Sequence, residues 1–165
     1  MLVYATSLAV KARLGILAYW LEGARQVFAY RFPRFRIVSE GHDYEGSGVV
    51  VGRTKSYGGP SNITTEADLF EDLFEVLAST ANKWLPNMWS LAAVLLGQHR
   101  KLKHLHFWKT RELRLLPVAG RRVHAQVDGE YIGTLPVEFR IVPDALTLAV
   151  PPHIVSGHEG VRARP

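Results

Sequence analysis

The chain combines many short apolar–polar segments with two longer stretches of helical periodicity. Apolar residues recur at three- and four-residue spacing over 14–30 and 86–96, which predicts two amphipathic helices. Pro86 fits the first turn of the second helix and Gly97 fits its C-terminal cap. The apolar face of this second helix is expected to pack on the core, and a lipid-contacting or pocket-lining face is the alternative.

Strand-like segments occupy most of the remaining chain. Alternation or short apolar runs predict strands at 35–38, 44–53, 73–78, 104–115, 122–127, 137–142 and 146–150. Turn residues separate them, as at 41–43. The pattern predicts a mainly β fold, an antiparallel β-sandwich or distorted barrel decorated by two α-helices. The domain is expected to span 1–152, followed by a disordered polar tail at 153–165.

The composition is that of a globular domain with excess positive charge. Of 165 residues, 47% are hydrophobic and 21% are charged, and no apolar run approaches the roughly 18 residues that a membrane span needs. The absence of cysteine excludes disulfides and thiolate metal sites and suits a reducing compartment. The net charge of +5 suits an anionic partner such as phosphate, nucleotide or acidic lipid, although solubility explains the excess equally well.

Two carboxylates stand two residues apart around a predicted tight turn. Asp128-Gly129 follows an alternating segment and is a strong hairpin signal, because both residues tolerate positive φ. Glu130 then begins the return strand. Asp128 and Glu130 either face water on an ordinary hairpin, which the residues alone favour, or form a metal- or proton-handling pair.

Three other stretches have both a chemical and a simpler interpretation. The periodicity of 67–80 is compatible with a helix, but an acidic turn at 68–72 followed by a strand is preferred. The glycine-rich loop at 56–62 could bring backbone N–H groups close to a phosphate, but no Lys-Ser/Thr signature or helix start follows it, which favours a bare turn. The connector at 98–106 is rich in basic residues and histidines. It has no convincing third metal ligand, so a solvated basic segment is favoured.

Four C-terminal segments occur in a characteristic order: Val127-Asp128-Gly129-Glu130, Leu135-Pro136-Val137, Val142-Pro143-Asp144-Ala145-Leu146 and Val150-Pro151. Upstream they are joined by Gly15-x-x-Ala18-Tyr19, Val49-Val50-Val51-Gly52-Arg53 and Tyr57-Gly58-Gly59. Together these segments resemble the C-terminal domain of diacylglycerol-kinase-like lipid kinases, the superfamily of bacterial diacylglycerol, sphingosine and ceramide kinases. The resemblance covers about 15–151. NAD kinases share a related architecture but match the C-terminal segments less closely.

The resemblance implies transfer of the γ-phosphoryl group of ATP to a diacylglycerol-like lipid hydroxyl, with Mg²⁺ as cofactor. It assigns Asp128 as the base or as a ligand to Mg²⁺-bound water, Gly129 to the nucleotide contact and Glu130 to the Mg²⁺–nucleotide network. Glu71 and Asp72 would correspond to a structural Mg²⁺ site. However, the family usually shows an Asp-Gly pair there, and the turn at 67–73 has no glycine.

The same resemblance sets the expected partners. They are the lipid substrate, a membrane surface and an N-terminal nucleotide-binding domain of the same parent chain, without which this chain is expected to be inactive. The family's Gly-Gly-Asp-Gly nucleotide loop does not occur in the sequence. The expected location is cytoplasmic and peripheral at the membrane. No nucleic-acid partner is expected, and a homodimer is left open.

A rival interpretation belongs to another class. It is a non-catalytic β-domain that binds an anionic membrane or a protein partner through Arg100, Lys101, Lys103 and the tail.

Overall fold

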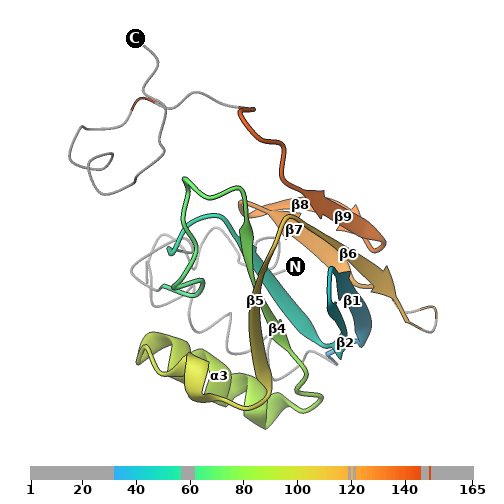
Figure 1. Ribbon diagram of the computed structural model, residues 1–165. Helices are drawn as coiled ribbons and strands as arrows, with labels where there is room; N and C mark the ends of the chain where they lie inside the picture. The colour runs from blue at the N-terminus through green and yellow to red at the C-terminus, as the bar shows by residue number, and fades with distance from the viewer. Residues whose placement is uncertain (1–31, 57–61, 119, 121, 146–148, 150–165) are drawn as a thin grey trace, which may run out of the picture.

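Two antiparallel sheets and one hairpin form the framework of the chain (Figure 1). The computed structural model describes residues 32–56, 62–118, 120, 122–145 and 149. The four-stranded sheet, in the order β2-β1-β6-β9, contains β1 Phe35–Ser39, β2 His42–Gly46, β6 Glu112–Pro117 and β9 Val137–Arg140. The three-stranded sheet, in the order β3-β4-β5, contains β3 Gly48–Gly52, β4 Phe74–Ser79 and β5 Leu105–Thr110. The hairpin pairs β7 His124–Val127 with β8 Glu130–Thr134.

The mainly β, antiparallel fold predicted from the sequence is therefore confirmed. Within the described residues the sheets do not close into a barrel. The turn predicted at 41–43 lies one residue earlier, at Glu40-Gly41, because Gly41 takes the positive φ of 72° that a two-residue hairpin loop needs. The predicted strand at 146–150 and the tail at 153–165 lie outside the described residues.

One α-helix and one 3₁₀ turn accompany the sheets, α3 Trp84–Leu95 and η1 His99–Lys101. The helix begins two residues before the predicted start at Pro86, so Pro86 still lies in its first turn. It ends as predicted at Gly97, which has a φ of 64° and donates its N–H to Val94 O, while Gln98 N–H reaches back to Ala93 O. The helix predicted at 14–30 lies outside the described residues. None of the helices in the described part is long and apolar enough to cross a membrane.

The predicted strands at 44–53 and 104–115 are wrong in one respect. Each is divided into two strands that belong to different sheets. The chain leaves β2 and enters β3 at Ser47, and it leaves β5 and enters β6 at Arg111. Ser47 N–H donates to Ser79 O at 2.8 Å, and Ile141 N–H donates to Arg111 O at 2.9 Å. Orthogonal sheet packings make corners in this way, with strands that switch sheets at a bend. We call Ser47 and Arg111 the two sheet corners.

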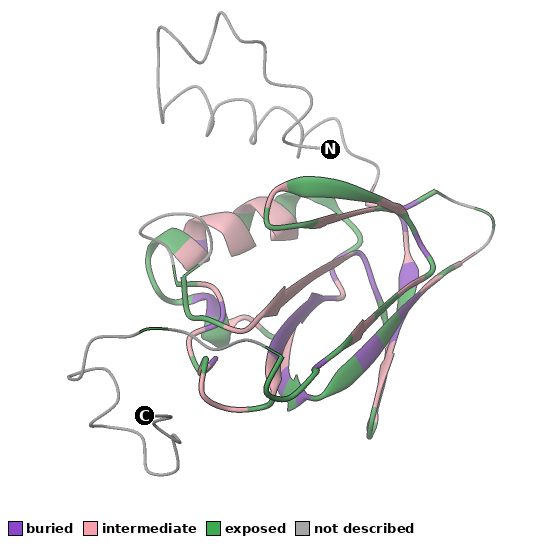
Figure 2. Cartoon of the chain, turned by 90° about the horizontal axis from the view of Figure 1, so that it is seen from above, coloured by how far each residue is buried: buried purple, intermediate pink, exposed green. Residues whose placement is uncertain are grey.

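The main core lies between the two sheets (Figure 2). Ile37 on β1 is fully buried, and it is paired with Tyr44 on β2 and with Leu115 on β6. The buried members of this core are Phe35, Ile37, Val76, Ala78, Trp108, Leu113, Leu115, Val123 and Leu135. Strand β4 is buried on both faces, because Val76 and Ala78 face this core and the intervening residues face α3 and η1. The central strand of the smaller sheet therefore has no solvent-exposed face.

The outer face of the four-stranded sheet carries ion pairs between neighbouring strands. They are Arg34–Glu45 at 2.9 Å, Arg114–Glu138 at 3.2 Å, Arg140–Glu112 at 3.5 Å and Arg36–Asp43. The hydrogen bond from Arg36 holds the pKa of Asp43 below its ordinary value. This polar face alternates with the apolar core face, as expected for an antiparallel sheet with one face in water.

Aromatic side chains join the two sheets where β2 faces β5. His42 stacks on Trp108 with ring centroids 4.9 Å apart, and Tyr44 stacks on His106 at 4.7 Å. Trp108 Nε1–H donates to Ser39 Oγ at 2.8 Å. Aromatic packing therefore fills this side of the space between the sheets.

Gly52 and Gly48 lie in the same strand and provide a matched test of the packing beside β3. A Cβ at Gly52 would overlap Thr64 Oγ1 and lie 3.0 Å from Thr64 Cγ2, whereas a Cβ at Gly48 would meet only Ser79 Cβ at 3.9 Å. We expect Gly52→Ala to lower the free energy of unfolding by about 1–3 kcal/mol. Gly48→Ala should change it by less than about 0.5 kcal/mol, or raise it slightly. Equal urea midpoints for the two variants would contradict this packing.

Candidate functional site

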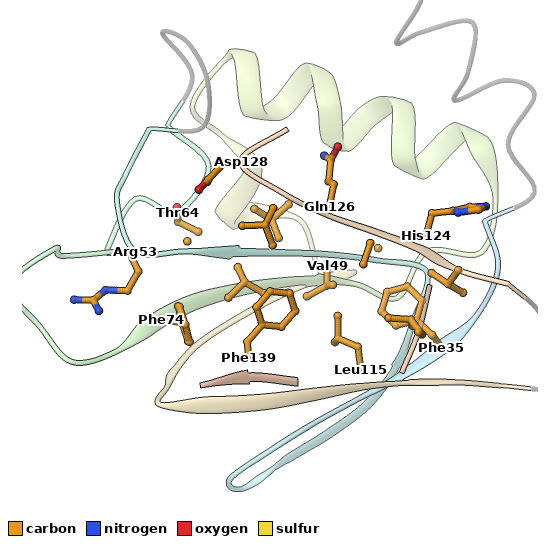
Figure 3. A pocket seen from close by; sticks show the side chains of 18 of the residues that line it. Phe35, Val49, Arg53, Thr64, Phe74, Leu115, His124, Gln126, Asp128 and Phe139 are labelled. Atoms are coloured by element: carbon orange, nitrogen blue, oxygen red, sulfur yellow. The ribbon is translucent and has the colours of Figure 1, made fainter. Parts of the chain in front are cut away.

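A cavity of about 670 Å³ lies between β3 and β9, beneath the hairpin β7–β8 (Figure 3). Its wall is mainly apolar. The apolar lining residues are Phe32, Phe35, Val49, Val50, Val51, Phe74, Leu115, Val123, Ala125, Val127, Leu135 and Phe139. The volume falls in the range of roughly 300–1,000 Å³ that is typical of small-molecule sites. The unfilled side of the space between the sheets therefore has the size and polarity of a binding pocket.

The cavity has a polar end. Arg53 and Thr64 lie next to the end of β3, and Asp128 follows the end of β7. Figure 3 shows these three side chains at the same end, while Phe35 and His124 lie at the other. Among the described lining residues, Asp128 is the one carboxylate and Arg53 the one cation. A long apolar wall with a charged end matches an amphipathic ligand better than a uniformly polar one.

Strand β7 separates apolar from polar side chains. Val123 and Ala125 belong to the core side of the strand, where Val123 is buried. His124 lies on the other side, where its Nδ1 is 3.4 Å from the Tyr131 hydroxyl. Figure 3 shows Gln126 and His124 directed away from Leu115 and Phe139. The alternation that predicted this strand therefore gives β7 one apolar face, towards the cavity, and one polar face.

The hairpin predicted at Asp128-Gly129 is confirmed. Asp128 has a φ of 50° and Gly129 a φ of 88°, and Val127 pairs with Glu130 across the turn. Positive φ at both central residues is the geometry of a type I′ turn, which Asp-Gly favours. The site therefore rests on a rigid two-residue turn rather than on a long loop.

The structure gives the two candidate carboxylates different positions. Both are exposed, and neither has an ion pair within the described part of the chain. Asp128 lines the cavity, whereas Glu130 is not among the described residues that line it. No group of three or more His, Asp or Glu that could hold a metal occurs in the described residues. Asp128 and Glu130 could therefore contribute to Mg²⁺ binding only together with phosphate oxygens and water, which is a common arrangement for this ion.

The second candidate metal site is partly occupied by other interactions. Glu71 forms an ion pair with Lys109 at 2.5 Å, and its backbone carbonyl accepts a hydrogen bond from Arg53 at 2.9 Å. Asp68 Oδ1 accepts a hydrogen bond from Phe70 N–H at 2.9 Å, which confirms the predicted acidic turn. Asp72 is exposed. The turn shapes the surface beside Arg53 and brings no further carboxylate to Glu71 and Asp72.

The basic connector at 98–106 is solvated at Arg100, Lys101 and Lys103, as predicted, but its histidines are not. His99 is buried, and its Nε2–H donates to Ile63 O at 2.9 Å. His104 Nε2 lies 2.7 Å from Ser90 Oγ on α3. Among the described residues His99 Nδ1 has no hydrogen-bond partner. The histidines are therefore used in packing and hydrogen bonding, because the connector folds back onto the outer face of β4 and β5.

A buried carboxylate holds this connector. Glu75 on β4 is 1% exposed, its Oε2 accepts a hydrogen bond from Glu66 N–H at 2.7 Å and its Oε1 is paired with Arg100. Arg100 also lies over the ring of Phe107 at 4.4 Å and donates to Thr65 Oγ1 at 2.6 Å. These bonds fix the segment that places Thr64 against Gly52. No local sequence pattern indicates this network, because its members are far apart along the chain.

Nearly the whole chain matches one known protein family. The model of the "YegS C-terminal NAD kinase beta sandwich-like domain" matches residues 2–150. The chain therefore belongs to this family of kinase C-terminal β-sandwich-like domains, as the resemblance of its C-terminal segments predicted.

Two individual relatives agree with this assignment. The chain is similar to a diacylglycerol kinase of Bacillus subtilis (strain 168), with 25% identity over 140 residues that make up 84% of this chain and 46% of the relative. Its fold is similar to that of a diacylglycerol kinase structure from Bacillus anthracis str. Sterne, with a TM-score of 0.54 and 17% identity over 82% of this chain and 50% of that one. The chain thus spans about half the length of these relatives.

The role of Glu75 can be tested by Glu75→Gln, which keeps the shape but removes the charge. We expect the free energy of unfolding to fall by about 2–3 kcal/mol, because Arg100 and Glu66 N–H both lose a charged acceptor. The matched control is Asp43→Asn in the exposed pair with Arg36, for which a clearly smaller change is expected. Similar urea midpoints for the two variants would show that the Glu75 network is not a principal support.

Proposed function

We propose that this chain is the acceptor-lipid-binding half of an ATP- and Mg²⁺-dependent lipid kinase that phosphorylates the hydroxyl of a diacylglycerol-like lipid. The observation that carries the proposal is the apolar cavity with Asp128 at its polar end. Its apolar wall suits acyl chains, and its charged end suits the hydroxyl-bearing head of the lipid. The diacylglycerol kinases among the relatives support the same substrate class.

In this proposal the cavity positions the acceptor. The acyl chains lie against Val49, Leu115 and Phe139, which exclude water and direct the free hydroxyl towards the end of β7. Asp128 accepts the hydroxyl proton while the oxygen attacks the γ-phosphorus in line with the leaving group. A carboxylate on a rigid type I′ turn is held in place before the substrate arrives, which is the arrangement that favours proton transfer.

The nucleotide is assigned to a second domain of the parent protein. Mg²⁺ bound with ATP supplies neutralisation of the charge on the transferring phosphoryl group. Glu130 and the backbone of Gly129 stand at the hairpin tip, where they would contact that nucleotide. Without the second domain the chain is proposed to be inactive. The complete enzyme is proposed to act in the cytoplasm, at the membrane surface.

Substitution of Asp128 tests the assigned base. In a protein that carries this chain together with its nucleotide-binding domain, Asp128→Asn should lower kcat by about 10²–10⁴-fold, because the amide does not accept the proton. Glu130→Gln should cause a smaller loss. The matched control is Glu40→Gln, which neutralises another exposed carboxylate on a hairpin turn and should leave kcat unchanged. Full activity of a folded Asp128→Asn enzyme would leave Asp128 an ordinary hairpin residue.

Filling the cavity tests the acceptor pocket separately from the chemistry. Val49→Phe places a ring in the cavity and should weaken binding of a short-chain diacylglycerol by at least about tenfold, with a change in the free energy of unfolding of about 1–3 kcal/mol. The same substitution at Val38, a strand residue outside the cavity lining, should leave binding unchanged. Isothermal titration of the chain with the lipid provides the measurement. Equal affinities of the two variants would place the lipid elsewhere.

A further inference from the structure

Within the described part of the chain, the side of α3 opposite β4 is apolar and exposed. Leu85, Trp89 and Leu96 are 62%, 61% and 69% exposed. Their spacing of four and seven residues places them in one stripe along the helix. Trp84 and Leu95 are also exposed, and Ala93 is the one fully buried residue of α3. The core-packing face predicted for this helix is therefore wrong for most of its large apolar side chains.

This exposure does not come from a loosely attached helix. On the opposite side of α3, Asn87 Oδ1 accepts a hydrogen bond from Ser79 Oγ on β4 at 3.2 Å, and Ser90 Oγ contacts His104. Residues of α3 are also absent from the described lining of the cavity. The apolar stripe is thus a fixed outer surface of the molecule, beside the three-stranded sheet (Figure 1).

The charges around the stripe have a single sign. The sequence contains no Asp or Glu from residue 76 to residue 111. Lys83 precedes α3, and Lys101 and Lys103 follow it, and all three are exposed without an ion pair to any described residue. Arg100, in contrast, is bonded to Glu75 and Glu66. Cations with no ion-pair partner among the described residues therefore stand at both ends of an apolar stripe.

We propose that this surface docks the protein on an anionic lipid bilayer. The α3 surface consists of Trp84, Leu85, Trp89, Leu95 and Leu96 with Lys83, Lys101 and Lys103. Tryptophan favours the boundary between headgroups and acyl chains, and lysine can keep its ammonium group among anionic headgroups while its stem lies on apolar surface. No carboxylate between residues 76 and 111 opposes such a membrane, and Glu66, beside the connector, is paired with Arg100.

A second copy of the chain fits this surface less well. A two-fold symmetric contact through α3 would bring the lysines of both copies to one interface, with no carboxylate in that region to pair with them. The docking surface also lies outside the acceptor cavity. The membrane proposal rests on the membrane location proposed above and names the surface that binds there, and vesicle binding tests it separately from phosphoryl transfer.

Co-sedimentation of the whole chain with vesicles tests the proposal. With about 30% phosphatidylglycerol in phosphatidylcholine, the chain should bind, and binding should weaken as salt rises or the anionic lipid is omitted. The double variant Leu85→Ser with Trp89→Ser should bind at least about tenfold more weakly. Lys101→Gln with Lys103→Gln should cost about fivefold per lysine.

Matched controls remove the same groups from other elements. Ile132→Ser with Val142→Ser removes similarly exposed apolar side chains, and Lys55→Gln with Arg111→Gln removes two exposed charges. Both controls should bind vesicles as the unmodified chain does. Equal losses in the controls would overturn the proposal. Unchanged vesicle binding by the α3 variants would also overturn it. If these variants also have a lower sedimentation mass than the unmodified chain, the α3 surface is a protein interface.

Discussion

The two sheet corners at Ser47 and Arg111 fix how the sheets lie against each other, and the cavity follows from them. At the first corner a side chain on Gly46 would lie 2.8 Å from Ile37 Cδ1, so the close approach there requires glycine. Ser47 is further held by its hydrogen bonds to the backbone after β4. With both corners fixed, aromatic rings fill the side between β2 and β5, and the side between β3 and β9 keeps an apolar space under the hairpin. The position of Asp128 over that space depends on the same constraint.

The buried Glu75 connects the two functional regions proposed for this chain. On one side its bonds to Glu66 and Arg100 hold the segment that places Thr64 at the polar end of the cavity. On the other side they hold η1 and so orient the connector that carries Lys101 and Lys103. A fully partnered buried carboxylate suits this role, because loss of either partner leaves an uncompensated group in a poorly solvated place. The bonds of Glu75 thus support both the polar end of the cavity and the lysines of the α3 surface.

Much of the fold could be predicted from local patterns, and the failures have physical causes. Alternation identified β1 and β7, and the preference for a strand at 73–78 was correct for β4. Asp128-Gly129 marked the turn after β7 and Gly97 the end of α3, because those conformations depend on the residues themselves. The sheet corners were missed, because the change of partner strand at a bend is decided by tertiary pairing and not by the local residues. The ion pair of Arg100 depends on Glu75, which is 25 residues away, and the exposure of Trp89 depends on what the rest of the chain leaves uncovered. The resemblance to lipid kinases predicted a catalytic role for Asp128. The cavity wall could not be predicted, because it depends on how β3 and β9 lie against each other.

The central claim is that acyl chains enter the space between β3 and β9. Photo-crosslinking measures this directly, with a diacylglycerol that carries a diazirine at the end of one acyl chain, followed by mass spectrometry of the labelled peptides. The expected labels lie on Val49, Val51, Phe74 and Phe139, deep along the apolar wall, and unlabelled diacylglycerol should compete with them. Labelling confined to α3 and the outer faces of the sheets would contradict the assignment of the cavity as the acceptor site.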